Sequence, residues 1–155
     1  MNITKALALL GMAGRISNRR GDSQAVKGPG TGNKATNAFL KELRENAFDK
    51  SGEVCSEQRI CGHTAHAVDF YFQSEATIVE VALGIPNSAT EYEKDVLKAI
   101  MAKENGYKVD RLFFISRPGA AEKCQQPGRA WLKDKHGIET EVHELAGEPR
   151  RPVRN

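Results

Sequence analysis

The spacing of apolar residues predicts helices and strands that alternate along most of the chain. Apolar positions three and four residues apart, the spacing of one helix face, occur in residues 36–48 and 86–106, and Pro127 suits the first turn of a third helix, PGRAWLKDKH. Four runs rich in β-branched and aromatic residues predict strands: HAVDFYF, ATIVEVAL, DRLFFIS and IETEVHEL. Gly106 and Gly137 follow the second and third helical segments and are the expected ends of those helices.

The first two predicted strands are separated only by the polar residues QSE, so we expect them to form a hairpin. A turn centred on residues 73–76 places Phe72 opposite Thr77 and Phe70 opposite Val79. The elements then follow in the order helix, strand, strand, helix, strand, helix, strand. This alternation after a hairpin predicts the α/β class, with a mixed central sheet flanked by helices (α-β-β-α-β-α-β).

A chain of 155 residues is long enough for one packed domain. In residues 1–35, the apolar run ITKALALLGMAG predicts a helix, because no signal-peptide cleavage site follows it, and a flexible basic loop begins at residue 14. Residues 36–146 contain the predicted α/β domain, and residues 147–155 form a basic tail expected to be disordered. No run approaches the roughly 18 apolar residues that a membrane helix needs.

Two acids, Asp69 and Glu80, interrupt the apolar runs of the predicted hairpin. In the register given above they are directly opposite one another, with Cβ atoms about 5 Å apart, and like charges so placed destabilise a sheet. A divalent cation held by both would remove the conflict, and carboxylate oxygens suit Mg²⁺. Acids on half-buried strands usually face solvent, but Tyr71, Ile78 and Ala82 share this face and make it mostly apolar.

The run VDFYFQSEATIVEVA, followed by a helix and RLFFIS, resembles the core of the PD-(D/E)XK nuclease-like superfamily, which has a restriction-endonuclease-like fold. In that family an Asp and a Glu on adjacent strands bind Mg²⁺, and a Lys two residues after the Glu assists the attacking water. The resemblance implies that Asp69 and Glu80 are catalytic residues and ligands of Mg²⁺ (or Mn²⁺). It implies metal-dependent hydrolysis of nucleic-acid phosphodiester bonds. Ala82 stands at the Lys position, so an inactive nucleic-acid-binding module on the same fold is the alternative.

Two residues of the helix after the hairpin are candidates to complete the catalytic site. On a helical wheel of residues 89–101, four apolar residues define the expected buried direction: Ala89, Val96, Leu97 and Ile100. Glu93 falls within this stripe, so we expect it to face the core as a third acid. Lys94 lies at the edge of the stripe, where its long side chain could supply the missing positive charge. In the competing interpretation, Glu93 is a first-turn acid favoured by the helix dipole and Lys94 is an exposed lysine.

The charge of the chain permits nucleic-acid binding without requiring it, since 23 Lys and Arg against 20 Asp and Glu give +3. Basic residues near both ends could bind backbone phosphates: Arg15, Arg19, Arg20, Lys27, Arg150, Arg151 and Arg154. Nucleic acid, DNA in the first instance, is therefore the expected partner. A homodimer is a further expectation, because many nucleases of this type are dimers. The odd set of three cysteines fits a reducing cytoplasm.

A zinc-dependent structural protein is another alternative, because CSEQRICGHTAH places four potential ligands within twelve residues: Cys55, Cys61, His63 and His66. Five residues separate the two cysteines, whereas structural zinc ligands usually pair two to four residues apart. The spacing is therefore poor for a zinc site.

Overall fold

A computed structural model of the chain describes residues 4–20, 34–47, 53–64, 66–82, 88–116 and 128–145. The elements within these residues are, in order, α1 (Thr4–Arg20), α2 (Lys34–Glu45), β1 (Ser56–Gln58), β2 (Val68–Phe72), the 3-10 turn η3 (Gln73–Glu75), β3 (Thr77–Ala82), α3 (Ser88–Glu104), β4 (Arg111–Ser116), α5 (Gly128–His136) and β5 (Glu139–Glu144). The fold is α/β, with a mixed sheet flanked by helices, as the sequence predicts.

The five strands described form one sheet in the order β1-β2-β3-β4-β5. The β1–β2 and β2–β3 pairs are antiparallel, whereas β3–β4 and β4–β5 are parallel. Parallel neighbours need a crossover connection, and α3 and α5 lie in the two crossovers. Through its crossover, α3 is placed against the sheet beside the hairpin that carries the two predicted acids.

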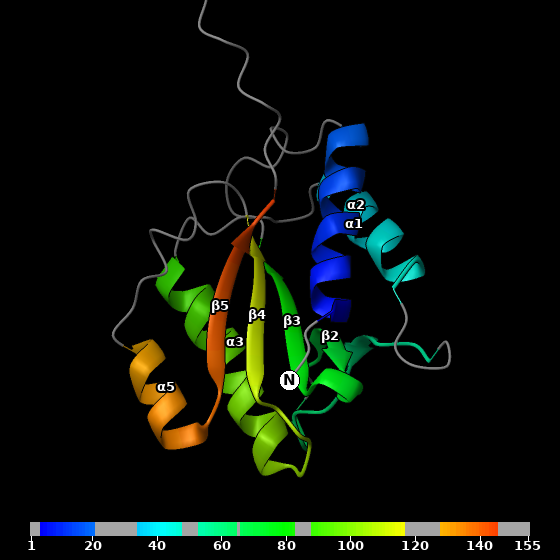
Figure 1. Ribbon diagram of the computed structural model, residues 1–155. Helices are drawn as coiled ribbons and strands as arrows, with labels where there is room; N and C mark the ends of the chain where they lie inside the picture. Colours follow the sequence, from blue (N-terminus) through cyan, green and yellow to red (C-terminus); the bar gives the residue numbers. More distant parts are fainter. Residues whose placement is uncertain are drawn as a thin grey trace, which may run out of the picture.

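Helices cover both faces of the sheet, with α1 and α2 on one side and α3 and α5 on the other (Figure 1). The first pair packs on sheet residues that include Phe70, Val79 and Phe113. The second pair packs on the opposite face, on sheet residues that include Ile78 and Phe114. This division follows from the alternation of side chains along each strand, and the molecule therefore has two apolar layers separated by the sheet.

The register of the β2–β3 hairpin is the predicted one, with Phe70 paired to Val79 and Phe72 to Thr77. The turn between the strands closes through Ala76, which has a left-handed backbone with φ 48° and donates its N–H to the carbonyl of Gln73 at 3.2 Å. Because side chains alternate along a strand, the residues next to these pairs lie on the opposite face of the sheet, the face covered by α3.

One prediction about the N-terminal part of the chain is wrong, and one strand there was not predicted. A loop was expected from residue 14, but α1 continues to Arg20, because Ile16 extends its buried stripe and is only 6% exposed. This helix shares a hydrophobic cluster with α2 and the sheet, so it belongs to the same packed unit. Strand β1 lies before the predicted hairpin, with Ser56 paired to Phe70, and none of the predicted strands corresponds to it. The observed order of elements therefore includes a strand before the hairpin that the sequence analysis did not contain.

The predicted glycine ends of two helices are confirmed. Gly106 follows α3 with φ +93°, and the N–H of Tyr107 reaches back to the carbonyl of Ala102 at 3.1 Å. Gly137 follows α5 with φ +65° and donates its N–H to the carbonyl of Lys133 at 3.0 Å. A residue without a side chain adopts this left-handed conformation at no steric cost, so each glycine lets the chain leave a helix and enter the next strand.

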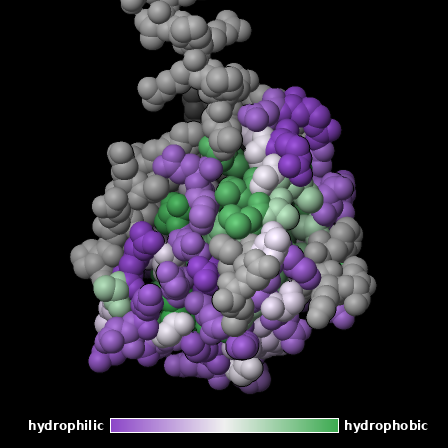
Figure 2. Space-filling view, in the orientation of Figure 1, coloured by the Kyte–Doolittle hydropathy of each residue, from purple (hydrophilic) through white to green (hydrophobic). Residues whose placement is uncertain are grey.

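The face of the molecule in Figure 2 is largely hydrophilic, with hydrophobic residues where α1 meets the strands. Leu10, Met12 and Val81 are partly buried and pack against the hydrophobic cluster that α1 and α2 form with the sheet. None of the helices described is long and apolar enough to cross a membrane. The predicted loop at 21–33 and the predicted tail at 147–155 lie outside the described residues.

Candidate functional site

The two acids predicted from the hairpin lie on neighbouring strands and interact. Asp69 is on β2 and half-buried, whereas Glu80 is on β3 and only 2% exposed. The N–H of Val81, next to Glu80 on β3, donates to Asp69 Oδ2 at 2.8 Å. This hydrogen bond fixes the Asp69 carboxylate against the strand that carries Glu80, close enough for its charge to act on the Glu80 carboxyl.

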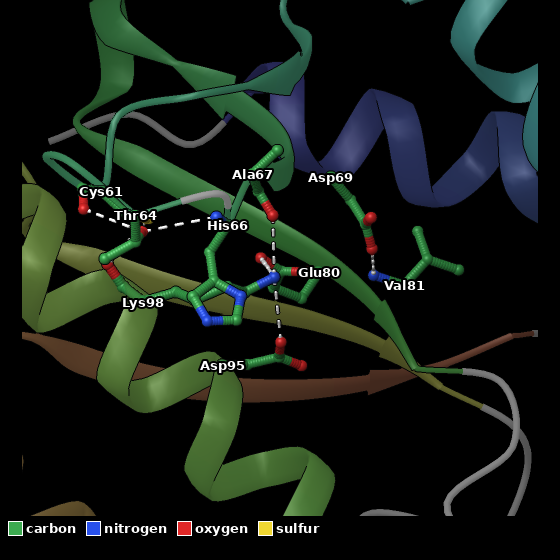
Figure 3. Close-up of polar contacts among 9 residues, drawn as sticks. All are labelled: Cys61, Thr64, His66, Ala67, Asp69, Glu80, Val81, Asp95 and Lys98. Atoms are coloured by element: carbon green, nitrogen blue, oxygen red, sulfur yellow. Dashed lines mark hydrogen bonds and ion pairs between the residues drawn. The ribbon is translucent and has the colours of Figure 1, made fainter.

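A lysine from α3 reaches this acid pair. The Nζ of Lys98 lies 2.9 Å from Glu80 Oε1 and 3.2 Å from Asp95 Oδ1, and it donates a hydrogen bond to the carbonyl oxygen of Ala67 at 2.9 Å (Figure 3). Only 8% of the Lys98 side chain is exposed. The ammonium therefore has oxygen partners from three segments: the residue just before β2, strand β3, and its own helix.

The charges in this cluster perturb one another. The pKa of the Glu80 carboxyl is raised well above its usual 4.5, chiefly by burial and then by the charges of Asp69 and Asp95, while Lys98 acts in the opposite direction. Burial alone would lower the pKa of Lys98, but the charges of Glu80 and Asp95 outweigh it and raise that pKa. Lys98 is therefore held as an ammonium, and its charge favours an ionised Glu80.

The helix face assigned to Glu93 is wrong. Glu93 and Lys94 are both exposed, and Leu97, which helped to define the expected buried direction, is 55% exposed. The face that α3 turns to the sheet instead carries Asp95 and Lys98. The predicted buried direction of α3 was set by its apolar residues alone. The helix instead buries Asp95 and Lys98, because Lys98 forms an ion pair with Glu80 on the sheet.

Lys98 is the residue that the sequence analysis missed. It lies one turn after Lys94 and supplies a positive charge beside Glu80, which is the role predicted for Lys94. A signal for it was present in the sequence: Asp95 and Lys98 have the i, i+3 spacing of an ion pair on one helix face. The contact of Lys98 with the Ala67 carbonyl could not be predicted in this way, because every residue has a backbone carbonyl and the sequence does not distinguish one from another.

A metal ion is compatible with the donor chemistry of the Asp69–Glu80 pair. Among the residues described, no group of three or more His, Cys, Asp or Glu is placed to hold a metal. Mg²⁺, however, is commonly bound by one or two carboxylates, several waters and substrate phosphates, without a complete protein cage. Two neighbouring carboxylates fit that pattern, and the buried Glu80 Oε1 already has a cation, the Lys98 ammonium, at 2.9 Å.

The zinc alternative is not supported by the positions of its proposed ligands. Cys55 packs in the α1–α2 layer and Cys61 in the α3–α5 layer, on opposite faces of the sheet. Each thiol donates to a backbone carbonyl, Cys55 to Ala47 and Cys61 to Lys98, both at 3.4 Å. Two thiols separated by a sheet cannot bind one ion.

The basic residues proposed to bind phosphates are only partly visible in the structure. Arg15 and Arg19 are exposed on α1, and Arg19 forms an ion pair with Glu42 of α2. Because α1 covers the face of the sheet opposite to α3, these two arginines lie across the sheet from Lys98. The other proposed positions lie outside the described side chains.

The chain matches no protein-family model, no curated protein and no solved structure. The resemblance to the PD-(D/E)XK superfamily is therefore carried only by the residues quoted above, and nuclease activity, the metal ion, nucleic acid and a second copy of the chain remain predictions. What the geometry adds is a cluster of Asp69, Glu80, Asp95 and Lys98 between the sheet and α3.

Proposed function

We propose that this chain is a metal-dependent nuclease that hydrolyses phosphodiester bonds of nucleic acid, DNA in the first instance, with Asp69 and Glu80 as ligands of Mg²⁺ or Mn²⁺. The observation that carries the proposal is the 2.9 Å contact between Lys98 Nζ and Glu80 Oε1. The resemblance leaves one part of the catalytic set unfilled, the lysine that Ala82 replaces on the strand. Lys98 supplies a cation beside the same glutamate from a helix.

Each residue of the cluster has a distinct task in this proposal. Asp69, oriented by the N–H of Val81, and Glu80 hold the metal. The metal, when bound, polarises the phosphate and lowers the pKa of a water molecule. Lys98 contributes a positive charge near the reacting phosphate, where negative charge develops during hydrolysis. The half-buried Asp69 is at the more accessible side of the cluster, whereas Glu80 is enclosed.

The test is cleavage of supercoiled plasmid and of labelled single- and double-stranded DNA and RNA, with Mg²⁺ or Mn²⁺ and with EDTA. Asp69→Asn and Glu80→Gln should each reduce the rate at least about 100-fold, the scale of a positioned catalytic group. Glu93→Gln and Lys94→Ala, on the exposed part of α3, serve as matched controls and should cut at near the wild-type rate. Cleavage that persists in EDTA, or that survives both acid substitutions, would contradict the proposal.

A nucleic-acid-binding module without catalysis is the second candidate. It is favoured by one observation: the ammonium of Lys98 already neutralises Glu80, so the cluster satisfies its own charges without a metal. In this case the same substrates should be retarded in a mobility-shift assay while remaining uncut with either metal. Retardation should then be unaffected by Asp69→Asn, because the acids would have no metal to hold.

A further inference from the structure

The Lys98 ammonium occupies a position that has the chemistry of a small cation site. Three oxygens from separate parts of the chain surround it: the Ala67 carbonyl at 2.9 Å, Glu80 Oε1 at 2.9 Å and Asp95 Oδ1 at 3.2 Å (Figure 3). The lysine and both acids are nearly inaccessible to solvent. A lysine ammonium is a compact point charge, so the side chain acts here as a cation tethered to α3.

Lys98 contacts one acid on the sheet and one on its own helix, and this difference decides which contact can be kept if the ammonium moves. Glu80 belongs to β3, so its 2.9 Å contact with Lys98 crosses from the helix to the sheet. Asp95 lies on the same helix as Lys98, three residues earlier, so this ion pair can persist wherever the ammonium turns within its reach. Lys98 can therefore release Glu80 while keeping Asp95.

A divalent cation and the ammonium cannot both occupy the space beside Glu80 Oε1. At the 2.9 Å separation observed for Lys98, a second cation on the same oxygen would be repelled strongly in a buried site, because the effective dielectric constant there is far below that of water. A metal that binds Asp69 and Glu80 must therefore displace the ammonium. Asp95 is the acid within reach that can take up the displaced charge.

We propose, building on the proposed function, that Lys98 is a built-in competitor of the metal: it neutralises Glu80 in the metal-free protein and transfers to Asp95 when a divalent cation binds Asp69 and Glu80. Asp95 is then a positioning residue, since its main role toward the metal site is to receive the ammonium of Lys98. The arrangement makes metal affinity adjustable from α3. It also keeps a buried acid pair compensated when no metal is present.

The test is calorimetric titration of Mn²⁺ into the metal-free protein without nucleic acid. Lys98→Met removes the competing cation at similar length and should tighten Mn²⁺ binding at least about tenfold, a difference of about 1.4 kcal/mol. Asp95→Asn removes the place to which Lys98 moves and should weaken binding about fivefold or more, within the usual range of coupling between sites. Lys94→Ala, one turn away and exposed, is the matched control and should bind as the wild type does.

The double variant Lys98→Met with Asp95→Asn separates positioning from simple electrostatics. If Asp95 acts mainly by receiving Lys98, Asp95→Asn weakens Mn²⁺ binding much less once Lys98 is gone than it does in the wild type. If Asp95 attracts the metal directly by its charge, Asp95→Asn weakens Mn²⁺ binding equally in the wild type and in Lys98→Met. In that case the proposed transfer of Lys98 is wrong. Near-UV circular dichroism of each variant establishes that it is folded before titration.

A measurement on the wild type keeps the inference testable if a variant does not fold. In a protein with ¹³C-labelled lysine, the Cε signal of Lys98 should shift as Mg²⁺ saturates the site, while that of Lys94 stays in place. An unmoved Lys98 signal at saturation, or equal Mn²⁺ affinity in the wild type and Lys98→Met, overturns this inference and leaves the nuclease proposal standing. Absence of Mn²⁺ binding in every variant, together with an inert wild type, overturns both.

Discussion

Lys98 and Glu80 form a buried ion pair of 2.9 Å that joins the crossover helix α3 to strand β3. Glu80 is one of two opposed acids that the hairpin places side by side, and Lys98 is the residue that compensates them from outside the hairpin. The hairpin acids of the site follow from the sequence pattern of the strands. Lys98 joins them only because α3 packs against the sheet.

Lys98→Met should destabilise the metal-free protein by about 3–5 kcal/mol at pH 7, because Glu80 loses the partner that compensates it and must either carry an uncompensated buried charge or bind a proton at a pH above its usual pKa. Urea unfolding followed by circular dichroism measures the change. Lys94→Ala, an exposed lysine on the same helix, should change the free energy of unfolding by no more than about 0.5 kcal/mol. A loss equal to that of the control would show that Lys98 does not compensate Glu80.

The loss of folding stability caused by Lys98→Met should depend on pH. Burial and the neighbouring acids raise the pKa of Glu80 in the folded protein above its usual 4.5, and removing Lys98 takes away the charge that opposes this rise. The folded variant then retains a proton that the unfolded chain releases, so its stability falls as pH increases above about 4.5. Melting temperatures of wild type and variant should be closer at pH 5 than at pH 8, and a constant gap would contradict the assignment.

The register of the hairpin could be predicted because two independent patterns agree on it. Alternation of apolar residues sets which face is buried, and the short QSE turn sets which residues are opposed, so Phe70 and Val79 had to pair. Asp69 and Glu80 follow from that register. The fold class was predictable for the same reason, since strand runs and helical stripes are separated clearly along the chain.

The remainder of the site could not be predicted from hydrophobic periodicity, because its residues are defined by their partners. Asp95 and Lys98 look like surface residues in an amphipathic pattern, and only the presence of Glu80 across the interface makes their burial favourable. Leu97 caused the opposite error: it is apolar and was therefore expected to be buried, but it is 55% exposed. Hydrophobic periodicity identifies faces that exclude water and cannot identify faces that bury paired charges.

The packing of α1 can be tested with two leucines on the same helix. Leu9 is 2% exposed and lies in the α1–α2 layer, so Leu9→Ala should cost about 2–5 kcal/mol through lost burial and a cavity. Leu7 is 45% exposed, and Leu7→Ala is the matched control with an expected effect within about 0.5 kcal/mol. Chemical denaturation of the two variants decides the question, and equal effects would mean that α1 is not packed as described.

The two thiols in the described residues should react slowly in the native protein. Cys55 and Cys61 are both buried, and burial raises the pKa of the Cys61 thiol with an added contribution from Glu80, against the opposing charge of Lys98. In a Cys124→Ser background, which leaves only these two, an aromatic disulfide reagent should label them slowly in buffer and rapidly in urea. Fast labelling in buffer would place at least one thiol at the surface.

The segment from Cys55 to Cys61 belongs to both apolar layers, since its first thiol packs with α1 and α2 and its last with α3 and α5. The segment contains the edge strand β1, so the backbone passes from the first layer to the second at this edge of the sheet over a few residues. A local opening on one side displaces the other through this connection. The two layers should consequently melt in one cooperative transition, with no state in which one half stays folded alone.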